Sequence, residues 1–412
     1  MAQRHLDPTD PTAAAGPPPV PAGGDALADY LRAQATEFLR ALRLHRESGA
    51  GAHGNGAQSS GSHPSGAHPS GAGALDRGRG RGPAPAPDGP VDAARALRRA
   101  ARRLSGTLHT FQPLLDAEWA EAMRPELAWL SGTLALEHAY ASRLDRLLQA
   151  LHRLSGSAAF PAQQAGRAAP ARAAATADPA PVAPLAPSVT RPSPADRGNL
   201  TVGAAKAGAL LDRQLTLART RAHSTALQAL GSSRFHAVAD KVALLASEVP
   251  LKDTAAAAAD LRPLAAAARD RLTDAVAALP LVTAGNPYNA QALVHGLSPD
   301  PAPHPQDAQW HQVRLLLRLH RYALEVLAGT DAEDADGADG TTDVRLLAAG
   351  EALDRHRDAS EAAAAAAQAA RTPRIAPATA YALGVLHADQ RHEVEAARYA
   401  FQHSWRKEPI RL

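Results

Sequence analysis

Residues 310–325 read WHQVRLLLRLHRYALE, and this stretch decides the fold that the sequence predicts. Its apolar residues recur every three or four positions, which indicates an α-helix and not a strand. Its basic residues His311, Arg314, Arg318 and Arg321 fall within roughly 80° of one helix face at about 100° per residue. Like charges at this spacing destabilise a helix by about 0.2–0.5 kcal/mol per pair. The stripe therefore predicts an anion close to it.

The same helix, expected over 309–328, also predicts a buried side. We expect Leu315, Leu319, Tyr322 and Val326 to face a core. That arrangement would place the cationic stripe at the edge of the core, where a ligand can reach it.

A second basic helix, over 91–111, has the same spacing. Arg95, Arg98 and Arg102 repeat the offsets of the first three cations, and Arg99 and Arg103 widen the stripe. Two helices built on one spacing indicate a duplicated unit. If the two halves face each other, their stripes would line one groove or pore, and a polyanion would be its natural ligand because phosphates neutralise arginines. The competing interpretation is an ordinary solvated helix face.

The rest of the chain is typical of an all-α protein. Alanine, the best helix former, supplies most of the 45% hydrophobic share, and we find no convincing period-two strand. Further helical patterns are expected at 26–45, in two helices within 118–154, from 202 onward, and at 260–279, 344–371 and 376–406. The predicted fold is two helical bundles from a pseudo-two-fold duplicated repeat.

Low-complexity stretches divide these helices. Gly, Ser, Ala, His and Pro dominate 48–90, and Ala and Pro dominate 155–197, so neither can supply a packed core. We expect a disordered tail (1–25), a first half-repeat (26–154, with the flexible insert 48–90), a linker (155–197) and a second half-repeat (198–408, with the acidic loop 329–343).

Several of these residues resemble the CHAD family, the conserved histidine α-helical domain. His311, Arg314, Arg318, Arg321 and the trailing R-Y-x-x-E match the family's H-x-x-R-x-x-x-K/R-x-x-R helix. The resemblance extends to LDRHRD at 353–358, to ALGVLHADQR and FQHSW within 382–405, and to the Ser-Arg-Phe at 233–235. In the first repeat it covers RRLSGTLHTFQPLL from Arg102 and WLSGTL at 129–134.

The first repeat departs from the family pattern. Arg95 replaces the signature histidine, Ser105 replaces an arginine, and His138 and Ala139 stand where many members have an Arg-Asp pair. A permanent charge at Arg95 keeps anion attraction but loses the pH sensitivity of a histidine. We therefore expect the second repeat to carry most of the binding.

The resemblance implies a basic channel that binds inorganic polyphosphate, without catalysis and without a cofactor or metal, and targeting to polyphosphate granules. The acidic motif of the triphosphate-hydrolysing domain that accompanies some members is not found. The residues expected to contact the polyanion are His311, Arg314, Arg318, Arg321, Tyr322, Arg95, Arg98, Arg102, Arg103 and Arg234.

Composition excludes several other classes. The 412 residues contain no cysteine, which excludes disulfide scaffolds and thiolate metal sites. No signal peptide or membrane span is recognisable, so we expect a soluble cytoplasmic protein. His53, His63 and His68 lie in a Gly/Ser/Pro stretch without fixed geometry, and the acidic residues of 331–343 lack the glutamate that closes a calcium loop. Neither group is expected to bind metal.

Two rival functions stay open. The arginine stripes would also suit nucleic acid, although aromatic residues for stacking on single strands make up only 4% of the chain. A phosphate-metabolising, metal-dependent enzyme is the less favoured alternative, because no phosphate-binding loop, zinc-protease helix or serine elbow occurs. His356 and Asp358 are close on one helix, but no nucleophile accompanies them.

Overall fold

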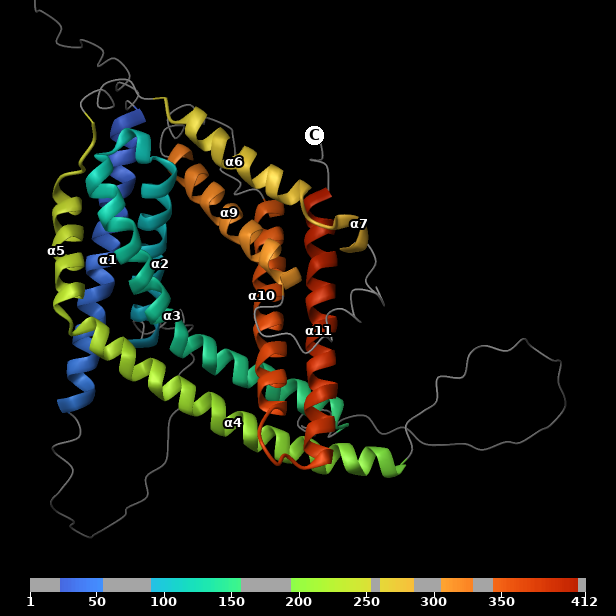
Figure 1. Ribbon diagram of the computed structural model, residues 1–412. Coiled ribbons are helices and arrows are strands. Elements are labelled where there is room, and N and C mark those ends of the chain that lie inside the picture. The colour runs from blue at the N-terminus through green and yellow to red at the C-terminus, as the bar shows by residue number, and fades with distance from the viewer. Residues whose placement is uncertain are drawn as a thin grey trace, which may run out of the picture. The chain divides into compact units, whose positions relative to one another are not determined.

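The computed structural model describes residues 23–54, 90–156, 194–252, 260–284, 305–328 and 344–406 (Figure 1). Within these ranges the chain is all-α, as predicted, and the one β-bridge, Leu115 to Leu251, is isolated. The elements are α1 (Gly23–Gly54), α2 (Pro90–Thr110), η1 (Gln112–Leu114), α3 (Ala117–Leu154), α4 (Pro194–Leu230), α5 (Ser233–Ser247), α6 (Arg262–Ala277), α7 (Leu281–Ala284), α9 (Pro305–Ala328), α10 (Val344–Ala370) and α11 (Pro377–Arg406).

Several sequence predictions lie wholly or largely outside the described residues. These are the tail 1–25, the insert 48–90, the linker 155–197, the acidic loop 329–343 and the histidines at 63 and 68. His53 lies in α1, but its side chain is not among those described.

Several predicted helix boundaries are wrong. Helix α1 continues to Gly54, beyond the end predicted at residue 45. Helix α4 begins at Pro194, before the start expected at 202. The stretch 118–154 forms one helix, α3, where two were expected, although Pro125 and Gly132 lie inside it. A glycine costs a helix only about 1 kcal/mol relative to alanine. The alanine, leucine and glutamate residues around it are strong helix formers, so the helix continues.

The described residues form two compact units. Unit 1 takes its residues from 1–131, 236–270 and 319–341, and unit 2 takes its residues from 132–235, 271–318 and 342–412. Helices α3, α5, α6 and α9 contribute residues to both units. These units are defined by contacts in space, whereas the two half-repeats are defined by a duplication in the sequence. The bounds of the half-repeats stay a prediction.

Unit 1 is built around the packing of α1 on α2. Leu27, Leu31 and Phe38 of α1 and Leu97 and Leu104 of α2 are completely buried. Asp116 caps the start of α3 by accepting a hydrogen bond from the Trp119 amide at 2.7 Å. This bond pairs one of the backbone N–H groups that the first turn of a helix leaves without a partner.

A glycine sets the distance between α2 and the end of α9 in unit 1. A Cβ atom at Gly106 would lie 2.6 Å from Cδ2 of Tyr322. The absence of a side chain at Gly106 therefore lets the Tyr322 ring pack directly against the α2 backbone. The ring is buried, as the sequence predicted for this position.

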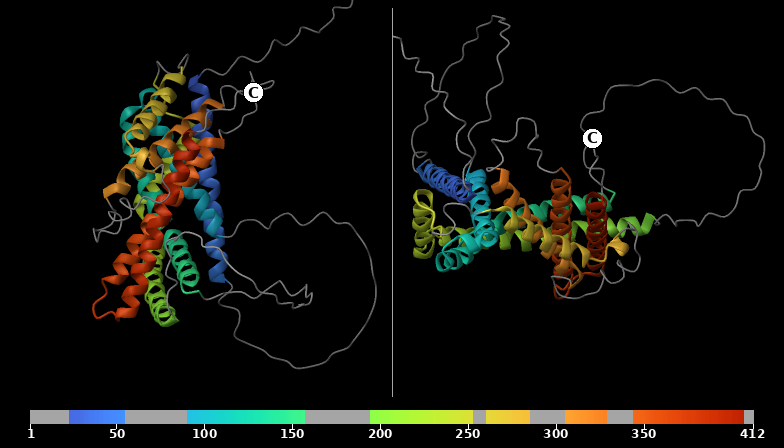
Figure 2. Two further views of the ribbon diagram at one scale, coloured as in Figure 1. Left: turned by 90° about the vertical axis from the view of Figure 1, so that its right-hand side faces the viewer. Right: turned by 90° about the horizontal axis from the view of Figure 1, so that it is seen from above.

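Unit 2 is built on a helical hairpin. Helices α10 and α11 run side by side, and α4 packs against both (Figures 1 and 2). The α4 backbone approaches α11 closely at Gly203, where a Cβ would lie 2.2 Å from the Ala378 carbonyl oxygen. Alanines of α10 and leucines of α3, α4 and α11 form one core cluster of the unit. A second cluster gathers Trp310, Val313 and Leu317 of α9 with Phe401.

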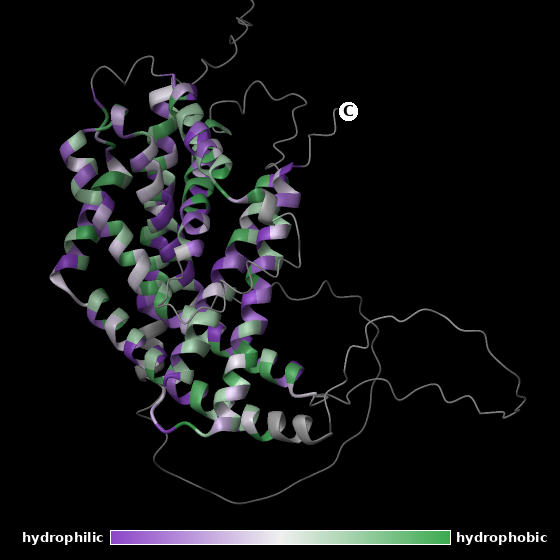
Figure 3. Cartoon of the chain, turned by 45° about the vertical axis from the view of Figure 1, so that its right-hand side comes forward, coloured by the Kyte–Doolittle hydropathy of each residue, from purple (hydrophilic) through white to green (hydrophobic). Residues whose placement is uncertain are grey.

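Figure 3 shows hydrophilic and hydrophobic residues interspersed along the helices. On α9 one prediction is wrong: Leu315 is 54% exposed, whereas Leu319, Tyr322 and Val326 are buried as expected. Leucines occur on several sides of α9. Leu317, two residues after Leu315, lies in the core instead.

Candidate anion-binding site

The α9 cations of unit 2 lie at the edge of its core. Trp310, Val313 and Leu317 turn inward, and each is followed in sequence by a member of the stripe, His311, Arg314 and Arg318. The arginine side chains are largely covered, with 17% of Arg314 and 23% of Arg318 exposed. The predicted stripe is therefore present, and its arginines lie partly within the protein.

Helix α10 supplies a carboxylate to these arginines. Asp354 accepts a hydrogen bond from Nε of Arg314, and its Oδ1 lies 3.6 Å from Nη2 of Arg318. The anion that the stripe predicts thus comes at least in part from the chain itself. The Asp354 side chain is 57% exposed, far more than the side chains of the two arginines.

A second carboxylate of α10 repeats this arrangement. Glu361 forms an ion pair with Arg143 of α3 and accepts a hydrogen bond from Nε of Arg357 at 2.8 Å. Arg143 also lies over the Tyr140 ring, 5.3 Å from its centroid. Sequence reasoning missed this pair, because its members come from separate parts of the chain.

The electrostatics of the α9 face show crowded, partly desolvated charges. Burial lowers the pKa of Arg314, and the neighbouring charge of Arg318 lowers it further. Burial also lowers the pKa of His311, although Asp307 and Glu361 oppose the effect. Since the ordinary value is already below 7, His311 is neutral at neutral pH and offers a ring N–H and not a charge. On α10, burial raises the pKa of Asp358, which lies between Asp354 and Glu361 in the sequence.

A buried ionic cluster lies behind the stripe. Asp307 accepts hydrogen bonds from Arg391 at 2.8 Å and from Arg398 at 2.7 Å, and all three side chains are almost completely buried. Arg398 also donates to Glu395 at 2.7 Å and to Nε2 of His356 at 3.3 Å. This network holds α9, α10 and α11 together.

His356 links the cluster to the stripe. Its ring stacks on Trp310 and lies edge-on to His311, with centroids 5.5 Å apart in both cases. Burial lowers the pKa of His356 to about 4, against the opposing effect of the neighbouring Asp307 carboxylate. For Asp307, burial alone would raise the pKa, but the contacts with His356 and Arg391 hold it well below its usual range.

The unit 1 arginines of α2 differ in exposure. Arg98 and Arg102 are half-buried, whereas Arg95 is exposed and pairs with Asp92 on its own helix at 3.3 Å. Arg321, at the end of the α9 stripe, is also half-buried, and Arg234 is exposed in the first turn of α5. Ser105 donates a hydrogen bond to the Arg124 carbonyl and so takes a structural position.

Arg103 is already engaged by a carboxylate of unit 1. Its Nε and Nη2 donate to Glu325 at 2.7 and 3.2 Å, and the Tyr30 hydroxyl donates to the same carboxylate at 2.8 Å. The hydrogen bond with Glu325 raises the pKa of Arg103, and burial raises that of Tyr30. Tyr322 lies beneath the guanidinium, 5.9 Å away. Arg103 and Tyr322 therefore join α1, α2 and α9.

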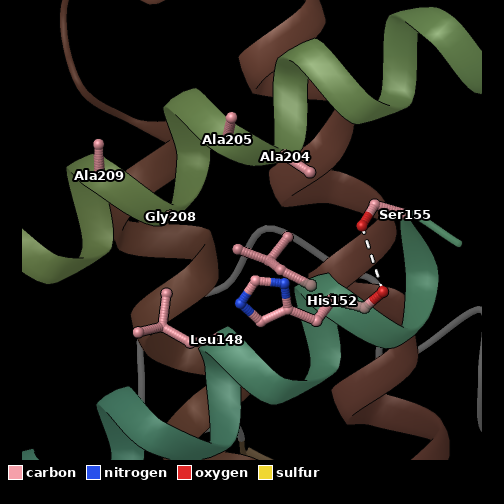
Figure 4. A pocket seen from close by; sticks show the side chains of 8 residues that line it. Leu148, His152, Ser155, Ala204, Ala205, Gly208 and Ala209 are labelled. Carbon is pink, nitrogen blue, oxygen red and sulfur yellow. Dashed lines mark hydrogen bonds between the residues drawn. The ribbon is translucent and has the colours of Figure 1, made fainter. Parts of the chain in front are cut away.

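A separate groove of unit 2, of about 310 Å³, contains none of the predicted residues. Leu148, Leu151 and His152 of α3 face small residues of α4, including Ala204 and Gly208 (Figure 4). Its lining is mainly apolar, so it is not suited to a highly charged anion.

The described ranges contain no group of three or more acidic or histidine side chains arranged for a metal ion. None of the helices they contain is both long and apolar enough to cross a membrane.

Comparison with known proteins identifies a family and a similar solved structure. The model of the CHAD domain family matches residues 82–367. A solved structure described as PptA from Streptomyces chartreusis is 61% identical, with a TM-score of 0.66 over 94% of this chain and 100% of that chain. Among curated proteins, none matches this sequence.

Proposed function

Because the chain belongs to the CHAD domain family, we propose that it binds inorganic polyphosphate through its helix-borne cations and performs no catalysis on it. In unit 2 the ligand would contact Arg314 and Arg318, with His311 donating a hydrogen bond from its neutral ring. In unit 1 it would contact Arg98, Arg102 and Arg321. Targeting to polyphosphate granules would follow from this affinity.

One observation carries the proposal most directly. Arg314 and Arg318 lie one turn apart on α9, are mostly covered, and both contact the Asp354 carboxylate. Two partly desolvated cations on one helix face attract negative charge, and the contact with Asp354 shows that an anionic group can reach them. Guanidinium groups bind phosphate oxygens through charge-assisted hydrogen bonds, which gain strength as water is removed.

Other predicted residues receive supporting roles in this proposal. Arg103 and Tyr322 would hold the α2–α9 contact in unit 1 in place, since both already have partners there. Arg95 and Arg234 are exposed and would add long-range attraction to the polyanion.

The test is binding of long-chain polyphosphate across a salt series. Replacing both arginines (Arg314→Ala with Arg318→Ala) should weaken binding more than about tenfold at low salt, because two charge-assisted contacts are lost. The slope of log affinity against log salt should also become shallower, by up to about two units. Arg32→Ala with Arg40→Ala, on α1, removes the same charge from exposed pairs and serves as the control.

The same assay separates the rival functions. Failure of the wild-type protein to bind polyphosphate at low salt would refute the proposal. DNA that competes with polyphosphate at equal phosphate concentration would favour nucleic-acid binding. Release of phosphate in the presence of magnesium or manganese would favour an enzyme.

A further inference from the structure

The α9 arginines of unit 2 already contact a carboxylate of the protein. Nε of Arg314, a donor that a phosphate oxygen would use, donates to Asp354, and Nη2 of Arg318 faces the same carboxylate. A phosphate placed on this donor would have to share it with a negative oxygen. The two anions would repel each other at that distance, so one would have to leave.

The exposure of the three side chains indicates which group moves. Asp354 is 57% exposed, whereas its arginine partners are 17% and 23% exposed. A carboxylate that is mostly in water can rotate away at little cost, because solvent replaces its hydrogen bonds. The arginines are covered and stay in place.

The second carboxylate of α10 also contacts two arginines, but it is less exposed than Asp354. Glu361 is 31% exposed, and its partners Arg143 and Arg357 are 16% and 33% exposed. It follows Asp354 by seven residues, so the two lie on nearly the same side of α10, separated by about 10 Å along the axis. Both carboxylates thus accompany the cations of one face of unit 2.

We propose that Asp354 is a built-in competitor that a phosphate chain must displace, and that it lowers the affinity of this face for polyphosphate. The inference rests on the proposed polyphosphate binding and names the residue that tunes its strength. The cost of displacing Asp354 is the same for a short and a long chain, so it weakens the binding of both by the same factor.

Removing the competing charge should therefore strengthen binding. Asp354→Asn keeps the shape of the side chain but not its charge. We expect tripolyphosphate and long-chain polyphosphate each to bind about fivefold more tightly to this variant, a change of the size that one partly exposed ion pair supports. The two gains should be similar, because both ligands displace the same carboxylate.

A matched control separates this effect from a simple gain of positive charge. Glu47→Gln on α1 makes the same change in net charge, and Glu47, paired with Arg43, is also 57% exposed. Its affinities for both ligands should stay within twofold of wild type.

The outcomes separate the inference from the function on which it rests. If wild type and variants all fail to bind long-chain polyphosphate at low salt, the proposed function falls. If wild type binds but the affinities of Asp354→Asn match those of Glu47→Gln, only the competitor role falls. Thermal unfolding of the variants, expected to match wild type closely, checks that each is folded.

Discussion

Unit 2 contains the same ionic motif twice, one aspartate shared by two arginines, in two different environments. In the Asp307 cluster, Asp307, Arg391 and Arg398 are 2%, 3% and 5% exposed. In the Asp354 cluster, the aspartate is 57% exposed. Both clusters join α9 to a neighbouring helix of the hairpin.

Burial gives these two clusters different physical roles. Ions that are removed from water depend on one another, so no member of the Asp307 cluster can leave without stranding the others. An exposed carboxylate exchanges its partner for water or for another anion at little cost. The Asp307 cluster therefore holds the helices together, and the Asp354 cluster is the part that can respond to a ligand.

The largest expected effect breaks the buried cluster. Asp307→Asn should lower the free energy of unfolding by about 3–5 kcal/mol, because Arg391 and Arg398 would stay buried without their shared carboxylate. Urea unfolding followed by circular dichroism measures the loss. The same substitution in the exposed cluster, Asp354→Asn, should cost less than about 1 kcal/mol. Equal losses from the two variants would show that burial does not separate the clusters.

A smaller effect comes from protonating His356 beside the buried cluster. Burial lowers the pKa of His356 to about 4, below its ordinary value of 6.5. As pH falls between these values, the unfolded chain takes up a proton before the folded chain does. Stability should therefore be complete above pH 6.5 and should fall below it by about 1.4 kcal/mol per pH unit.

Chemical unfolding at a series of pH values tests this dependence. His311 acts in the same direction, because burial lowers its pKa too, whereas Asp307 loses its stabilising charge only at still lower pH. His356→Gln should flatten the slope whatever its effect on overall stability. An unchanged slope in that variant would assign the pH dependence to other groups.

The sequence predicted the parts of the site that depend on one helix alone. The cation stripe of α9 could be recognised because helical spacing fixes which residues share a face. The α9 burial pattern was right for Leu319, Tyr322 and Val326 and wrong for Leu315. Leucine occurs on several faces of α9, so periodicity did not identify the buried one.

The partners of the stripe could not be predicted in the same way. Asp354 lies 40 residues from Arg314, and Glu361 lies 218 residues from Arg143. Arg391 and Arg398 are ordinary charges on a helix until packing buries them. The one local signal was their seven-residue spacing, which the buried residues Val394 and Phe401 share. Which carboxylate meets which arginine is decided by the packing of helices that are distant in sequence.

The smallest effect concerns the intermediate case, the Glu325 cluster of unit 1, where Arg103 and Glu325 are 29% and 30% exposed. Glu325→Gln should lower the free energy of unfolding by about 1 kcal/mol, because the amide oxygen still accepts one hydrogen bond while the charge-assisted pairing is lost. Tyr30→Phe removes only the hydroxyl donor and should cost less. Polyphosphate affinity should stay near that of wild type, since Arg103 remains packed over Tyr322. An affinity gain as large as that of Asp354→Asn would instead place Arg103 among the exchangeable cations, and half-burial would then be insufficient to make an ion pair structural.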